Sequence, residues 1–226
     1  MECPFKNSKP RWTRRKDARP QELLAAALDL FVEKGYAATR LEDVASRAGV
    51  SKGTLYLYFE NKEELFKAVV RENVVPVLGE AEEIVDNYQG GSVELFREIA
   101  MGWWERIGNT KLSGITKLMV AESSNFPEVT RFYHDEVISR GNAMIERMLK
   151  RGIQRGEFRD IDVRQAANIV CAPMVMLMLW KHSFAPCQAE PLSPDDYLNN
   201  FIDLFLRGVL VRENADAATP PPLHSR

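Results

Sequence analysis

The sequence contains few cysteines and no long uninterrupted apolar run, and each shortage excludes a class of protein. Only three of the 226 residues are cysteine, and none of them has CxxC spacing. This count excludes a disulfide framework and a cysteine-based zinc site. The longest apolar run, residues 169–180, is interrupted by Pro173 and is shorter than the roughly 20 residues of a membrane-spanning helix. We expect no membrane span. The polar, basic N-terminus does not look like a secretion signal, so we expect a cytoplasmic protein.

The short motifs by which many enzymes are identified are also missing. The sequence has no glycine-rich nucleotide loop, no HExxH and no GxSxG. Of its three histidines, His182 adjoins Trp180 and is expected in a core or an interface. The pair Asp195 and Asp196 is typical of a charged helix start. The alternative hypothesis of an enzyme is therefore disfavoured. We expect no catalytic activity, no cofactor and no metal site.

What the chain does contain is an ordinary globular composition with an uneven distribution of charge. Charged residues make up 27% and hydrophobic residues 45%, which excludes global disorder. Residues 1–58 carry a formal net charge of +4, whereas residues 59–226 carry −6. A basic block before an acidic remainder is typical of a nucleic-acid-binding module attached to a non-binding body, although solvated faces can look similar.

Apolar spacing predicts an all-α fold between two flexible ends. Apolar residues recur at intervals of three and four, and strict alternation is absent. Residues 1–19 hold seven lysines and arginines without apolar periodicity, which predicts a flexible basic arm. Residues 213–226 include three consecutive prolines and are expected to form a disordered tail.

Signals for helix starts and stops are dense near the N-terminus and predict two short helices joined by a tight turn. The turn falls at residues 48–51 and contains a glycine, which is the spacing of a helix-turn-helix. A plain helical hairpin is the alternative. The predicted starts and stops, in chain order, are Pro20, Gly35, a capping box of Thr39 with Glu42, Gly49, Ser51, and a capping box of Asn61 with Glu64.

The helix that follows the turn favours the DNA-binding alternative. At 100° per residue, Leu55 and Phe59 share its inner face, whereas Gly53 and Leu57 point elsewhere. A glycine within a helix and an outward leucine are poor choices for a solvated surface. They suit a face that meets DNA.

Three segments, TRLEDVA at 39–45, GVSKGTLYLYF at 49–59 and NKEEL at 61–65, resemble the tetracycline-repressor (TetR) family. The resemblance covers roughly residues 20–70. It implies a homodimeric one-component transcriptional regulator, usually a repressor that binds a palindromic operator and is released by a small organic ligand. We therefore expect a three-helix helix-turn-helix domain over 20–66 and a helical ligand-binding and dimerisation domain over 67–212.

The resemblance also assigns DNA contacts to individual residues. Helix N-termini at Ser51 and Asn61 suit phosphate oxygens, and Lys62 adds a charge there. Leu57 offers only apolar contact, so we expect a thymine methyl beside it. The implied phosphate contacts are Thr39, Ser51, Tyr58 and Lys62, the implied major-groove contacts are Lys52, Gly53, Thr54, Tyr56 and Leu57, and Arg40 belongs to the same surface.

Several of these residues have a simpler interpretation. Tyr58 could be a core tyrosine with a wet hydroxyl, and Lys52 could be a solvated lysine. The arm at 1–19 could enter an adjacent minor groove or could only improve solubility.

In the body, two helices are apolar on more than one face. The stretches 163–184 and 195–211 are expected to pair with their symmetry mates in a four-helix dimer interface, which the resemblance also implies. A single monomeric core is the alternative.

Methionines and tryptophans concentrate in the same body and suit an adaptable apolar pocket, although they equally suit a helical core. An inward Glu122 would favour a cationic ligand. A body that only dimerises, in a constitutive DNA-binding protein, is the rival hypothesis, and repression and activation are both open. The candidate ligand-binding residues are Trp103, Trp104, Met119, Glu122, Phe126, Tyr133, Met174 and Met178.

Overall fold

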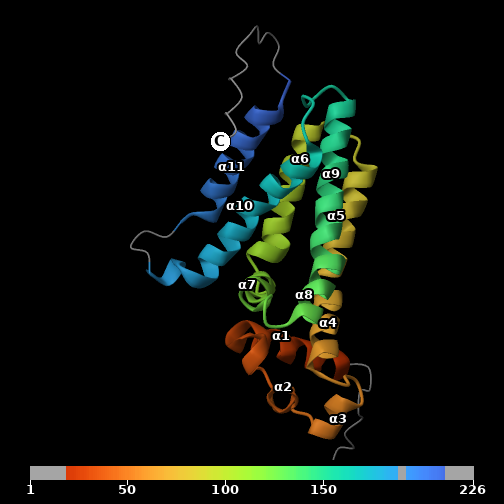
Figure 1. Ribbon diagram of the computed structural model, residues 1–226, viewed down its shortest axis with the longest axis vertical. Helices are drawn as coiled ribbons and strands as arrows, with labels where there is room; N and C mark the ends of the chain where they lie inside the picture. Colours follow the sequence, from red (N-terminus) through yellow and green to blue (C-terminus); the bar gives the residue numbers. More distant parts are fainter. Residues whose placement is uncertain (1–18, 188–191, 212–226) are drawn as a thin grey trace, which may run out of the picture.

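The computed structural model describes residues 19–187 and 192–211, and all regular elements within these residues are helical (Figure 1). The all-α prediction is confirmed. The predicted basic arm, apart from Arg19, and the predicted tail lie outside the described residues. The helices are α1 (Arg19–Ala38), α2 (Leu41–Arg47), α3 (Lys52–Tyr56), α4 (Lys62–Asn73), α5 (Val75–Asn87), α6 (Ser92–Trp103), α7 (Ser113–Glu122), α8 (Pro127–Tyr133), α9 (Ser139–Gln154), α10 (Val163–Ser183) and α11 (Pro194–Val209), with π-helical turns η1 (Trp104–Gly108) and η2 (His134–Ile138) and a short 3-10 turn η3 (Ala185–Cys187).

The molecule is elongated, with a small head at one end of a longer body (Figure 1). The head consists of α1, α2, α3 and the first turns of α4. Helix α4 runs from the head into the body, where α5 and α8 pack against it and the helices from α5 to α11 pack against one another. The predicted domain boundary after residue 66 falls in the middle of α4.

Most of the helix starts and stops predicted for the head are found at the predicted residues. Gly35 adopts φ 83° and interrupts α1, and Gly49 adopts φ 67° in the turn after α2. These left-handed conformations suit glycine because it lacks Cβ. The side chain of Ser51 accepts a hydrogen bond from the Thr54 N–H, and that of Asn61 accepts one from the Glu64 N–H. The helix-turn-helix and both of these caps are confirmed.

The predicted capping box at Thr39 is wrong. Helix α2 begins after Arg40, which makes no side-chain cap. The Thr39 side chain is 1% exposed, and its hydroxyl lies 3.1 Å from the Leu30 carbonyl oxygen and 2.7 Å from that of Gly35. The interruption of α1 at Gly35 leaves carbonyl groups without their usual helical partners, and the nearby hydroxyl satisfies them.

An aromatic cluster joins the head to the body. The Phe31 and Tyr36 rings of α1 each meet the Phe66 ring of α4 edge to face, at centroid distances of 5.3 and 5.5 Å. Phe126, which precedes α8, lies 4.6 Å from the Tyr36 ring. These residues belong to a hydrophobic core that continues into α7, α8 and α10. Because this core is shared, a shift of the body helices α7, α8 or α10 also shifts the side chains that pack on α1 and α4.

Helix α10 is not interrupted by Pro173, although this proline interrupts the apolar run in the sequence. It continues through Pro173 and is, by length and composition alone, apolar enough to cross a membrane. A core helix passes the same test, and α10 packs against α7, α9 and α11.

Removing the Thr39 hydroxyl tests its structural role. Thr39→Val should lower the free energy of unfolding by about 1–3 kcal/mol, because the carbonyls of Leu30 and Gly35 lose the one O–H donor that they share. Urea titration followed by circular dichroism measures the change. Ser46→Ala, at an exposed site in α2, is the control and should stay within about 0.5 kcal/mol of the parent. Equal values for the two variants would contradict this role.

Candidate nucleic-acid interface and ligand cavity

The outer face of α3 and the residues after it are open to solvent. Leu57 is 83% exposed, Tyr56 44% and Tyr58 40%, whereas Leu55 and Phe59 are buried. The predicted orientation of this segment is confirmed, and Tyr58 is not a core residue. A leucine this exposed has no packing role within the chain, so the surface remains available to a partner.

The lysine on this face is already paired within the head. Lys52 Nζ lies 2.5 Å from Glu42 Oε1 of α2 and 5.7 Å from the centre of the Tyr56 ring. The hydrogen bond with Glu42 raises the pKa of Lys52. Both side chains of the pair are more than half exposed, so water screens their attraction. Lys52 therefore stays charged and can exchange its carboxylate for another anion.

Lys62, which we expect to bind phosphate, contacts the end of α1 within the chain. Its Nζ donates hydrogen bonds to the carbonyl oxygens of Tyr36 at 2.7 Å and Ala37 at 3.0 Å, and it lies 4.6 Å from the centre of the Tyr36 ring. Burial lowers its pKa, and the negative charge of Glu122 opposes this effect. The interrupted end of α1 thus already offers two backbone acceptors to this ammonium, and phosphate binding by Lys62 stays a prediction.

Glu122 and Phe126 lie beside the same end of α1. Glu122 Oε1 accepts a hydrogen bond from the Ala37 N–H at 3.4 Å, and the Phe126 ring packs on Tyr36. We call the group Tyr36, Ala37, Lys62, Glu122 and Phe126 the junction. Its acidic and aromatic members hold head and body together. Glu122 does not line the cavity described below, so the condition for a cationic ligand, an inward Glu122, is not met.

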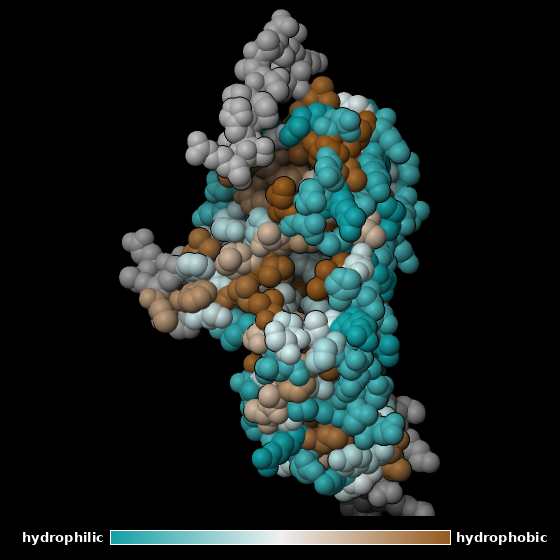
Figure 2. Space-filling view, viewed as in Figure 1, coloured by the Kyte–Doolittle hydropathy of each residue, from teal (hydrophilic) through white to brown (hydrophobic). Residues whose placement is uncertain are grey.

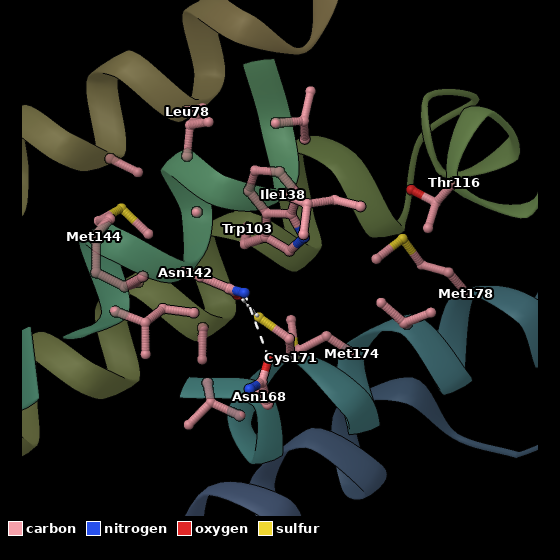
Figure 3. Close-up of a pocket in the computed structure, with 18 of the residues that line it drawn as sticks. Leu78, Trp103, Thr116, Ile138, Asn142, Met144, Asn168, Cys171, Met174 and Met178 are labelled. Carbon is pink, nitrogen blue, oxygen red and sulfur yellow. Dashed lines mark hydrogen bonds between the residues drawn. The ribbon is translucent and has the colours of Figure 1, made fainter. Parts of the chain in front are cut away.

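The body contains an apolar cavity of about 520 Å³, within the roughly 300–1,000 Å³ typical of small-molecule sites (Figure 3). It is partly open to solvent, since the lining residues Val120 and Ile138 are exposed. Its walls come from α5 to α10. Three of the candidate ligand residues do not line it: Trp104 is buried against other parts of the core, and Glu122 and Phe126 belong to the junction. The candidates that do line it are Trp103, Met119, Tyr133, Met174 and Met178.

Apart from Tyr133, sequence reasoning missed the polar residues of this cavity. Asn142 of α9 and Asn168 and Cys171 of α10 lie together in its wall, and Thr116 of α7 lies beside Tyr133 (Figure 3). The available signal was periodicity, because residues 168, 171, 174 and 178 recur at intervals of three and four on one face of α10. Among the described residues, no charged side chain lines the cavity.

Helix α7 touches both the cavity and the head. Thr116 and Met119 line the cavity, as does Ser123 at the end of the helix, whereas Glu122 binds the backbone of α1. A ligand that moves α7 therefore displaces a direct contact of the head.

Apolar side chains also remain exposed on α10 and α11. Leu204 is 71% exposed, Ile169 59% and Met176 49%. A groove beside them is bounded by Pro173 and Phe201. Apolar side chains are visible at the surface of the body in Figure 2. This is the region predicted to form the dimer interface.

Comparison with known proteins matches both parts of the chain. Residues 23–69 match the family model "Bacterial regulatory proteins, tetR family", and residues 95–191 match the model "Tetracyclin repressor-like, C-terminal domain". The fatty acid metabolism regulator protein of Bacillus subtilis is 27% identical over 158 residues, which cover 69% of this chain and 80% of that protein. The transcriptional repressor KstR2 of Mycobacterium tuberculosis is 26% identical over 176 residues, covering 77% of this chain and 86% of the repressor.

A solved structure agrees with the fold. The FadR regulator of Bacillus subtilis, in complex with stearoyl-CoA, superimposes with a TM-score of 0.70 at 23% identity, over 83% of this chain and 98% of that one. Regulators of this kind bind DNA and small-molecule ligands and are generally not enzymes. Because the two family models together match residues in both head and body, the chain belongs to the TetR family of bacterial transcriptional regulators.

Proposed function

We propose that the protein is a cytoplasmic, homodimeric repressor that binds a palindromic operator and is released by a small apolar ligand. The observation that carries this proposal is α7, which lines the cavity and also contacts the end of α1 through Glu122. An apolar ligand is also in keeping with the relatives, whose names refer to fatty acids and, for the solved structure of KstR2, to ketosteroids.

In this proposal, α3 enters the major groove. Leu57 and Tyr56 meet base edges, while Ser51 and Tyr58 contact phosphates, with Arg40 exposed beside them. Gly53 and Thr54 complete the reading face. Phosphate contacts position the protein, and the apolar and hydroxyl groups of the reading face distinguish bases. Lys62 and Thr39 act from behind this surface, since both bind carbonyls of α1 or the residues next to it.

Two copies are required because one reading helix is short. Helix α3 has five residues and is about 7.5 Å long at 1.5 Å per residue, which covers only a few base pairs. Two such helices about one turn of DNA apart would read a palindrome. We assign the dimer contact to residues 163–184 and 195–211, where Ile169, Met176 and Leu204 expose apolar surface.

Ligand release follows from differential affinity. A ligand that fits the cavity better when α7 is displaced weakens DNA binding only by the ratio of its affinities for the two states. The junction supplies the connection, because Glu122 and Phe126 sit on either side of the short break between α7 and α8 and both touch α1. If the body served only for dimerisation, there would be no reason for one helix, α7, to line the cavity and also to contact the head.

Selection of binding sites from random DNA tests the reading face. The ligand-free protein should enrich a palindrome with half-sites about one turn apart, and its affinity should fall with a log–log salt slope near −5 if about six phosphates are neutralised. Leu57→Ala should weaken the preference for thymine at one operator position by on the order of 1 kcal/mol, because an apolar contact with its methyl group is lost, and should change little elsewhere. Gln154→Ala, at an exposed site in the body, is the control. Unchanged preference at every position of the operator would rule out the assigned role of Leu57.

A charge on α11 tests the dimer. Leu204→Glu should shift the protein toward monomer in sedimentation velocity, because a carboxylate cannot be buried unpaired in an apolar interface. Leu57→Glu is a matched control, since that leucine is also highly exposed but lies on the reading face. The control should remain dimeric while losing operator affinity. Monomers in both variants, or dimers in both, would contradict the assignment.

A further inference from the structure

We propose that the cavity selects an uncharged ligand that carries a hydrogen-bonding group at each end of an apolar body. This inference rests on the proposed ligand-sensing function and specifies the chemistry of the ligand. It is carried by two separate polar groups in a mostly apolar wall, in which Ser123 and Thr130 supply the remaining hydroxyls (Figure 3).

The first polar group lies between α7 and α8. The Tyr133 hydroxyl lies 3.3 Å from the Thr116 hydroxyl, and the Tyr133 side chain is only 6% exposed. A bond between two hydroxyls uses one of their two O–H donors, so the pair retains a donor and several lone pairs for a ligand. Burial raises the pKa of Tyr133, which keeps the phenol neutral.

The second polar group lies between α9 and α10. The Cys171 thiol donates toward the Asn142 side-chain oxygen at 3.4 Å, and the Asn142 amide nitrogen donates to the Asn168 oxygen at 3.4 Å (Figure 3). This arrangement leaves Asn142 one further N–H and a second carbonyl lone pair. Burial raises the pKa of Cys171 to about 11, so the thiol is a neutral donor at physiological pH.

The two groups are separated along two helices. Asn142 lies nine positions after Tyr133 along the helical run from α8 through η2 to α9. On α10, Met178 lies seven positions after Cys171, and its side chain is drawn next to Thr116 in Figure 3. At about 1.5 Å per residue, both paths give a separation on the order of 10 Å. Met119, Met144 and Met174 provide flexible apolar surface elsewhere in the wall.

Polarity at both ends distinguishes this site from one built for a charged or single-ended lipid. A carboxylate at the buried Tyr133 end would be desolvated, and no cation stands among the described lining residues at either end. A molecule with one polar end would satisfy only one of the two groups. An oxygen function at each end satisfies both.

Three probes of one chain length test this selection in calorimetric titrations of the full-length protein: 1,8-octanediol, 1-octanol and octanoate. The diol should bind at least as tightly as the alcohol, although it is less hydrophobic. Octanoate at pH 8 should bind at least tenfold more weakly than the alcohol. Binding of both neutral probes should be the same at pH 6 and pH 9, since the pKa values of Tyr133 and Cys171 are raised.

Two variants assign the ends. Tyr133→Phe and Asn142→Leu should each weaken diol binding about tenfold, because one hydroxyl loses its partner. Each should change 1-octanol binding less than threefold, since the alcohol can reverse and use the intact end. Tyr88→Phe and Asn87→Leu, which lie outside the cavity lining, are the matched controls and should leave both probes unaffected.

Several results would overturn the inference: tenfold tighter binding of the alcohol than the diol, equal losses of both probes in the variants, tight binding of octanoate, or no binding of either neutral probe. Operator release is measured separately by fluorescence anisotropy of labelled DNA. Selective diol binding without release would contradict the proposed release by ligand and leave the cavity chemistry intact.

Discussion

The arrangement of the molecule depends on the interrupted end of α1. Gly35 breaks the helix, and the carbonyls and N–H groups exposed by the break are bound by the nearby Thr39 and by two residues distant in sequence. Thr39 binds them within the head, Lys62 binds them from the start of α4, and Glu122 binds them from the end of α7. Without the break, these backbone groups would pair along the helix and could not connect the head to the body. A local irregularity thus serves as the attachment point of three elements.

Sequence reasoning succeeded where the determinants are local. The caps at Ser51 and Asn61, and the outward Leu57, follow from residues within one turn of each other. It did not find the internal partners of Thr39 and Lys62, which depend on how α1 ends and how α4 packs beside it. A threonine before an acidic turn and a lysine at a helix start look the same in sequence whether they face solvent or a broken helix.

For the cavity too, sequence reasoning predicted the local composition but not the arrangement that depends on packing between helices. Methionine and aromatic content predicted an apolar pocket in the body, but composition does not distinguish Trp103, which lines it, from Trp104, which lies in the core. Neighbouring positions on a helix face different directions, and only the packing of all the helices decides which face meets the space. Glu122 follows Met119 and Val120, which line the cavity, yet the last turn of α7 directs its side chain to α1.

The pairing of Lys52 with Glu42 has a consequence for how such a head searches a chromosome. A lysine already paired with a carboxylate contributes little field at a distance, so it adds little to the sequence-independent attraction that holds a protein on arbitrary DNA. Because the pair is exposed, it exchanges partners at small cost once the groove fits. The head is thereby suited to short residence on random sequence, and the time spent at each wrong site falls while the contact remains available at the right one.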